Sequence, residues 1–439
     1  MTFSTLFSGL LSDSEAAEIF GDAATVGAMI KVEKALARVQ ARAGLIPAAT
    51  AETIVAAAES LHPDLEELIA GSARSGVPVI ALVEQLRAAA GPDAGAYVHW
   101  GATSQDVMDT ALVLRLGRLL EILEDRLVRV AERLAALAER HRSTLMAART
   151  RSQQALPTTF GLKAANWLLP LLRHRQRLAE IKQRLLVVQL GGAAGTLAAL
   201  NGQGLALMAA LAEDLGLGLP PAPWHSQRDN LVELAGWLAL VTGSLGKLGR
   251  DLVLLGQSEV AEVRPGTPGA SSTLPHKSNP VAAETLVTLA AYAAGRVASA
   301  HQAMVHEHER DGAAWQLESL VLPELAVATA AALGHAEAVL ADLVVDDARM
   351  RQNLEATGGL VLAEAASFAL AAHMPRSDAQ ALVQEACREA ASGGHLIEIL
   401  RERTSAPVDW PLLADPAKAL GATDALIDRI LAKMGEQRS

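Results

Sequence analysis

The chain has 439 residues, a formal net charge of −11 and a single cysteine. This length favours two or three subdomains over one small core, and one cysteine excludes a disulfide framework. The net negative charge and the absence of a Lys/Arg-rich block argue against a nucleic-acid-binding protein. Hydrophobic residues make up 51% but aromatic residues only 3%, so alanine and leucine favour long helices over sheets.

The first hundred residues predict several short helices. The stretch MIKVEKALARVQARAGLIP is amphipathic and is closed by Gly44 and Pro47. The segment AGPDAGAYVHWGATSQDVMD then interrupts the periodicity with glycines and a proline. We therefore expect an N-terminal helical domain over residues 1–108. The start of the chain lacks the basic segment of a secretory signal, which favours a soluble, cytoplasmic protein.

Five long helical patterns follow. From Leu112 to Leu137 leucines and valines recur in steps of three and four, and a second pattern follows the break MAARTRSQQALPTTFG as far as Gln189. Between Leu231 and Leu255 the steps alternate strictly between three and four, which is typical of a coiled-coil seam. Two further patterns span about 281–306 and 312–343. The sequence predicts an all-α protein with a central five-helix bundle over 109–345 and a small C-terminal helical domain over 346–439.

Four segments interrupt the helical periodicity and concentrate polar residues. They are HWGATSQD (99–106), RTRSQQ (149–154), WHSQRD (224–229) and GASSTLPHKSNP (269–280). Each alone has a structural explanation; TSQD, for example, suits a helix N-terminus with Ser104 or Asp106 as the cap. Four together indicate a functional site, provided that helix ends or neighbouring subunits bring them together.

These segments resemble conserved regions of the fumarase/aspartase superfamily. In GASSTLPHKSNP the matches to its signature loop (265–280 here) are Ser271, Ser272, Pro275, Lys277 and Asn279, with Leu274 where methionine is usual. GATSQDVMDTA, RTRSQQALPTTFG, WHSQRD and VHEHERDGAAWQLE are similar to regions of the branch that holds adenylosuccinate lyases and carboxymuconate-lactonising enzymes. The resemblance covers nearly the whole chain in the same order. It implies three domains, a homotetramer with a twenty-helix core, active sites built from loops of three subunits, and no metal or organic cofactor.

The resemblance also implies a reaction. Members of the superfamily remove a proton from the carbon next to a carboxylate while a group leaves the neighbouring carbon. The histidine of the lyases is replaced here by Arg151, and the histidine of many lactonising enzymes by Gln154. A leaving carboxylate departs as an anion and needs no proton, so the pattern favours lactone formation within a small tricarboxylate, 3-carboxy-cis,cis-muconate, in the beta-ketoadipate pathway. An adenylosuccinate-type lyase that releases fumarate, or a non-catalytic helical relative, stays open.

The resemblance assigns roles to particular residues. Ser271 is expected to move the proton, and Lys277 to favour its alkoxide and bind substrate carboxylate. For His99 and His225 a structural role is equally open, and Arg310 could equally form an ion pair with an acidic side chain. The candidate substrate-binding residues are His99, Thr103, Ser104, Thr150, Arg151, Gln153, His225, Ser272, Asn279 and Arg310.

Overall fold

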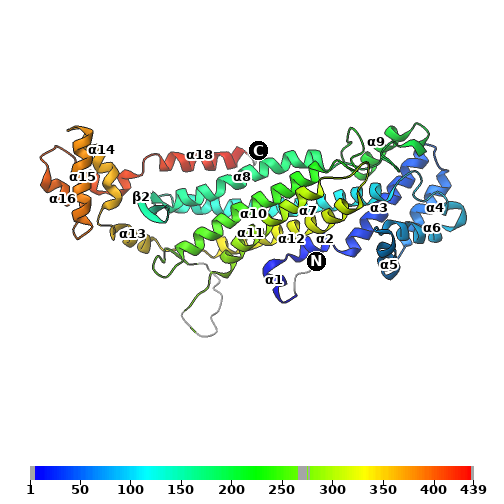
Figure 1. Ribbon diagram of the computed structural model, residues 1–439, viewed down its shortest axis with the longest axis horizontal. Helices are drawn as coiled ribbons and strands as arrows, with labels where there is room; N and C mark the ends of the chain where they lie inside the picture. Colours follow the sequence, from blue (N-terminus) through cyan, green and yellow to red (C-terminus); the bar gives the residue numbers. More distant parts are fainter. Residues whose placement is uncertain (1–4, 265–273, 275–276, 437–439) are drawn as a thin grey trace. The chain divides into compact units, whose positions relative to one another are not determined.

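The computed structural model describes residues 5–264, 274 and 277–436 (Figure 1). In these residues helices dominate and the strands form two short antiparallel pairs, so the predicted all-α class is confirmed.

The N-terminal region consists of several helices, as predicted, although one of them is not short, since it has 21 residues. Asp64 accepts hydrogen bonds from the N–H groups of Glu66 and Glu67, and Gly76 with φ 77° ends the same helix. The glycine–proline break predicted at Gly91 is a kink, because Gly91 has φ 79° inside a helix. The helices are α1 (Ser8–Leu11), α2 (Ser14–Ile19), α3 (Asp22–Arg42), α4 (Ala48–Ser60), α5 (Leu65–Ser75) and α6 (Val79–Gly95), preceded by the 3₁₀ helix η1 (Thr5–Phe7).

The five predicted long helices are confirmed, each within a few residues of its expected ends. They are α7 (Ser104–Arg140), α8 (Phe160–Leu185), α10 (Asp229–Leu255), α11 (Val281–Ala303) and α12 (Gly312–Ala341). Every residue of the seam between Leu231 and Leu255 is buried, because its three–four spacing keeps these side chains on one face of α10. Between α8 and α10 lie η2 (Ala198–Leu200) and α9 (Gly204–Leu215).

The RTRSQQ segment is a β-hairpin, whereas the sequence predicted only a break before a helix. Strand β1 (Leu145–Thr150) pairs antiparallel with β2 (Gln153–Thr159), with a bulge between Ala147 and Arg149. A second short pair joins β3 (Val263–Arg264) to β4 (Val344–Val345).

The C-terminal region again has short helices, as predicted. Its apolar core includes Leu354, Leu370 and Leu400, and β1 adds Leu145 and Ala147 to the same core. The elements are α13 (Asp347–Glu355), η3 (Leu360–Leu362), α14 (Ala363–Ala371), α15 (Arg376–Ala390), α16 (Leu396–Arg403), α17 (Trp410–Ala414), η4 (Pro416–Ala419) and α18 (Thr423–Glu436).

The chain divides into two compact units, and each unit takes segments from the long helices. Unit 1 comprises Met1–Arg126, His174–Gly243 and Leu289–Leu333, and unit 2 comprises Leu127–Arg173, Ser244–Thr288 and Gly334–Ser439. These units cut across the long helices, so the three-domain division stays a prediction.

Long helices lie side by side within each unit. In unit 1, Trp237 Nε1 of α10 donates to the His174 carbonyl of α8 at 2.9 Å. In unit 2, Trp167 Nε1 of α8 donates to an Asp251 carboxylate oxygen of α10 at 2.8 Å. Buried donors on long side chains are thus paired with the neighbouring helix, which fixes the register between the two helices.

Helices α10, α11 and α12 are each long and apolar enough to cross a membrane by length and composition alone. For α10 and α12 the fold supplies another reason for this apolarity, since 56% and 67% of their most apolar windows are buried inside the chain. For α11 only 28% is buried. The apolar surface of α11 is therefore largely exposed in a single chain.

Candidate active site

The first group of polar residues gathers at the start of α7, in unit 1. Helix α7 begins at Ser104, so Thr103 occupies the N-cap position and the predicted caps, Ser104 and Asp106, are wrong by one and three residues. Asp106 instead accepts a hydrogen bond from the Thr103 N–H at 3.0 Å, which is the reciprocal half of a capping box.

The carboxylate of Asp106 also joins three separate segments. It accepts hydrogen bonds from the N–H groups of Gly191 at 2.8 Å and Gly192 at 2.9 Å, and His225 Nε2 lies 2.7 Å from its Oδ1. Both Asp106 and His225 are buried. His225 therefore stabilises the loops around Thr103 through its contact with Asp106. This buried position supports a structural role for His225 over a role in substrate binding.

Arg310 hydrogen-bonds to residues of the same loops. Its Nη1 donates to Thr103 Oγ1 at 3.0 Å and its Nε to Gln105 Oε1 at 3.1 Å. Its Nη2 donates to the carbonyls of Gly192 and Ala193 at 3.4 and 3.0 Å. These acceptors are neutral, so the guanidinium keeps its full positive charge beside Thr103.

Unit 1 also contains a cluster of buried charged residues. Arg228 donates to both oxygens of Asp109, at 2.7 and 3.0 Å, and to both oxygens of Glu318, at 2.9 and 2.6 Å. Burial alone would lower the pKa of Arg228, but the two carboxylates raise it, so the guanidinium stays charged. For Glu318 burial outweighs the attraction of Arg228 and raises the pKa of the carboxyl.

His99 pairs with a buried carboxylate. Its backbone has φ 65°, and its Nδ1 lies 2.5 Å from Glu33 Oε1. Burial lowers the pKa of His99, but the hydrogen bond and charge of Glu33 outweigh it, and the net shift is upward. The histidine therefore holds its proton to higher pH than a free imidazole does.

This pair predicts a pH-dependent contribution to stability. Because the pKa of His99 is raised in the folded state, the contribution is complete below the unfolded pKa and is lost as pH rises through the folded pKa. Glu33→Gln should therefore lower the melting temperature more at pH 5.5 than at pH 9. Calorimetry of both proteins at the two pH values checks this, and an equal loss at both would contradict a charged pair.

The second group belongs to unit 2 and stands on the β-hairpin. Thr150 and Gln153 face each other across a two-residue turn formed by Arg151 and Ser152, whose φ angles are 50° and 66°. Arg151 is exposed. Among the described residues no hydrogen-bond or ion-pair partner of its guanidinium is found, so this cation is available to an anionic ligand.

The signature loop is described only in part. The predicted catalytic Ser271 and its neighbour Ser272 lie outside the described residues. Lys277 is exposed and Asn279 is half-buried, and both precede the start of α11 at Val281. The candidate site residues that can be placed thus fall into one group in unit 1 and one in unit 2.

Sequence reasoning missed several residues that organise the two groups. Glu33 and Glu262, which pairs with Arg149 beside the hairpin turn, are both buried. Glu33 is 66 positions from its partner and Glu262 is 113 positions from its partner. Since no local pattern links residues so far apart, the sequence carried no signal for either pair.

Unit 2 contains a polar and an apolar cavity, and the polar cavity borders the second group. A polar cavity of about 480 Å³ is lined by residues that include Arg149, Ser152, Gln153, Gln154 and Asn353.

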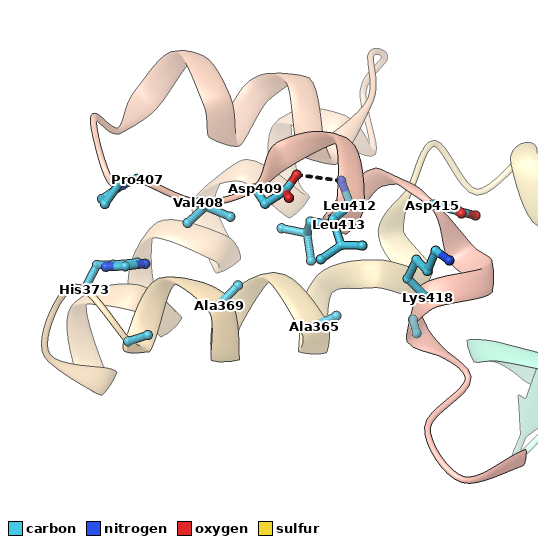
Figure 2. Close-up of a pocket in the computed structure, with 12 residues that line it drawn as sticks. Ala365, Ala369, His373, Pro407, Val408, Asp409, Leu412, Leu413, Asp415 and Lys418 are labelled. Atoms are coloured by element: carbon cyan, nitrogen blue, oxygen red, sulfur yellow. Dashed lines mark hydrogen bonds between the residues drawn. The ribbon is translucent and has the colours of Figure 1, made fainter.

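An apolar cavity of about 520 Å³ lies among the C-terminal helices (Figure 2). In Figure 2 the Asp409 carboxylate accepts from the Leu412 N–H, and alanines of α14 form one wall. None of the candidate site residues lines this second cavity, so it is separate from the candidate active site.

Comparison with known proteins gives consistent matches over the whole chain. Residues 12–295 match the lyase family and residues 359–430 match the adenylosuccinate lyase C-terminus. The 3-carboxy-cis,cis-muconate cycloisomerase of Pseudomonas aeruginosa is 48% identical over 94% of this chain and 93% of its own length. The enzyme of the same name from Bradyrhizobium diazoefficiens is 43% identical over 98% of each chain.

Solved structures of related enzymes also match nearly the whole chain. The 3-carboxy-cis,cis-muconate lactonizing enzyme of Pseudomonas putida superposes with a TM-score of 0.92 at 41% identity, covering 99% of this chain and 100% of that structure. A fumarate lyase from Mesorhizobium sp. BNC1 superposes with a TM-score of 0.90, also at 41% identity, covering 96% and 98%. With a family match over most of the chain and relatives above 40% identity, the chain belongs to the lyase family of the fumarase/aspartase superfamily.

Proposed function

We propose that this protein is a cycloisomerase that interconverts 3-carboxy-cis,cis-muconate and carboxymuconolactone. The observation that carries the proposal is the exposed Arg151 at the tip of the hairpin, where the fumarate-releasing lyases carry a histidine. A fixed cation cannot protonate a leaving nitrogen or oxygen, but it binds a carboxylate of a substrate that carries three of them. Relatives named for this activity, 40–48% identical over at least 90% of the chain, support the same conclusion.

The reaction needs few groups. One carboxylate oxygen of the substrate forms a bond to a carbon of the conjugated diene, and the electron pair moves toward the carbon alpha to another carboxylate. Ser271 then gives its hydroxyl proton to that carbon, and a proton from solvent restores the hydroxyl before the next turnover. In the reverse reaction the alkoxide takes the proton back from the carbon. Lys277 and Arg151 stabilise the negative charge that develops on the carboxylate oxygens. The candidate binding set is completed by Asn279, Ser272, Thr103, Ser104, Thr150, Gln153, His99 and Arg310. His225, buried against Asp106, supports these loops and does not bind substrate.

The active assembly is proposed to be a soluble, cytoplasmic homotetramer whose sites each combine loops from three subunits. Support comes from α11, which is apolar but little buried in one chain. In a homotetramer, contacts between subunits would bury the apolar surface of that helix.

The activity is tested by adding purified protein to 3-carboxy-cis,cis-muconate and following the loss of conjugated-diene absorbance. Adenylosuccinate serves as the parallel substrate. Rapid loss with muconate alone is the expected result. Turnover of adenylosuccinate alone would establish the fumarate-releasing alternative, and turnover of neither substrate would favour a non-catalytic relative.

Subunit sharing is tested by mixing two inactive variants. Ser271→Ala and Arg151→Gln subunits are unfolded together, refolded and assayed. If loops from different subunits form each site, on the order of a quarter of the sites in mixed tetramers receive both intact loops and activity reappears. Activity no greater than that of the separately refolded variants would show that each chain forms its own site.

A further inference from the structure

The hairpin that carries Arg151 turns through two residues in the left-handed region of the backbone. Arg151 and Ser152 have φ of 50° and 66°, and Thr150 pairs directly with Gln153 across the turn. Positive φ at both central positions is adopted far more readily by asparagine and glycine than by arginine and serine. The turn sequence thus disfavours its own conformation, so contacts outside the turn must hold it.

Apolar packing anchors the root of the hairpin but not its tip. Leu145 and Ala147 belong to the C-terminal apolar core. The tip borders the polar cavity of about 480 Å³ that Ser152, Gln153 and Gln154 help to line. Hydrogen bonds and charge, rather than close packing, must therefore fix this end of the hairpin.

The buried carboxylate of Glu262 supplies that fixation. Arg149 Nη1 donates to Glu262 Oε2 at 2.8 Å and Arg149 Nη2 to Oε1 at 2.6 Å, a two-pronged ion pair. Asn353 Nδ2 donates to the same Oε1 at 2.9 Å. The side chain of Glu262 is 0% exposed, so water cannot substitute for either donor. Arg149 lies one residue before Thr150, and its strand position is fixed by pairing with Gln154.

Glu262 is itself held by the surrounding backbone. Its N–H donates to the Leu255 carbonyl at 2.9 Å and its carbonyl accepts from the Asp346 N–H at 3.0 Å. Arg349 of α13 donates to the carbonyls of Glu259 at 2.7 Å and Val260 at 3.0 Å. Because its backbone is fixed by these hydrogen bonds, the Glu262 carboxylate can hold Arg149 of β1 at a defined position.

We propose that Glu262 is a positioning residue that sets the hairpin tip and thereby the guanidinium of Arg151. The inference rests on the proposed function, in which Arg151 binds a substrate carboxylate. The charge of Arg149 is neutralised by Glu262, so Arg151 is the cation that the hairpin offers to substrate. Glu262 touches no reacting atom and acts only through Arg149 and the turn.

The first test does not depend on activity. Glu262→Gln keeps the shape of the side chain but places an NH₂ group where one carboxylate oxygen accepted a hydrogen bond. Arg149 donates to both oxygens, so either orientation breaks one arm of the fork, and an NH₂ at the Oε1 position also breaks the bond with Asn353. We expect the amides of residues 149–154 to exchange with deuterium about tenfold faster in this variant, because the tip opens more often. The matched control is Glu355→Gln, an exposed glutamate of α13 that does not line the polar cavity, and this variant should exchange as the wild type does. Unchanged exchange in Glu262→Gln would overturn the proposal.

The second test asks whether the effect passes through Arg151. With 3-carboxy-cis,cis-muconate, Glu262→Gln should lower kcat/KM by about 10- to 100-fold, mainly through KM, because a small displacement of a binding group has large effects. In an Arg151→Gln background the same substitution should lower kcat/KM by less than about twofold, since residues that act as one unit are not additive. An equal loss in both backgrounds would mean a general structural role and would overturn the proposal. If the wild type does not turn over this substrate, the proposed function fails while the exchange experiment still decides the positioning role.

A milder variant keeps the proposal falsifiable if Glu262→Gln does not fold. Arg149→Lys retains the positive charge, but an ammonium cannot bind both carboxylate oxygens in a fork. It should show a smaller change of the same kind in both experiments. Wild-type exchange and kinetics in Arg149→Lys would also overturn the proposal.

Discussion

Replacing Ser271 with alanine is expected to lower kcat by about 10²- to 10⁴-fold, the range that one general acid or base contributes. Ser271 is the only group in the proposed mechanism that delivers the proton to carbon. Alanine removes the hydroxyl and leaves Lys277, Asn279 and Arg151 to bind the carboxylates. KM should therefore change much less than kcat, and the assembly should be unchanged. Steady-state kinetics with 3-carboxy-cis,cis-muconate and size-exclusion chromatography with light scattering measure the two outcomes.

Ser278 provides the matched control for this prediction. It is an exposed serine in the same segment, seven positions later, and it has no assigned role in the reaction. Ser278→Ala should keep kcat within about twofold of the wild type, as surface substitutions usually do. Near-normal turnover in Ser271→Ala would show that another group donates the proton.

The second large effect is on stability and concerns Arg228. Its side chain is 0% exposed and pairs with Asp109 at 2.7 Å and Glu318 at 2.6 Å. Arg228→Met removes the charge and leaves two carboxyl groups buried without a cation. Removing one partner of a buried ion pair costs about 3–5 kcal/mol, because the remaining charge stays desolvated. A decrease of several degrees in the melting temperature is expected at equal protein concentration.

Arg184→Met is the control for burial. Arg184 pairs with Glu233 within the same unit, but its side chain is 51% exposed. Water replaces the lost partner there, so the melting temperature should stay close to that of the wild type. A similar decrease in both variants would indicate loss of helix packing by the arginine stems rather than an unpaired buried charge.

The long helices could be predicted from the sequence because helix periodicity is local. The residues from Leu231 to Leu255 are spaced so that one face of α10 is apolar, and the structure buries that face. The hairpin could not be predicted because the contacts that hold it are not local. RTRSQQ carries neither an Asn-Gly turn nor strict alternation, and its strands are held by the C-terminal core and by Glu262, which are distant in sequence.

The candidate site could be predicted in part. The likeness of the signature loop and of the RTRSQQ segment to a family assigned roles to Ser271, Lys277 and Arg151. These roles stay predictions. For His225 the residue type left two roles open. Its buried ring, 2.7 Å from Asp106, supports the structural role, and only the folded chain could bring these two residues together.

By itself the sequence determined the helical class, the five long helices and the chemical family, since each depends on spacing or on a contiguous motif. The tertiary structure decided which charges are neutralised and which remain available. Arg149 and Arg228 are bound by buried carboxylates, whereas Arg310 meets neutral oxygens and Arg151 stands exposed at the turn. The reason is physical: pairing a charge requires a partner within a few ångströms, and here the partners of Arg149 and Arg228 lie 90 to 119 residues away along the chain.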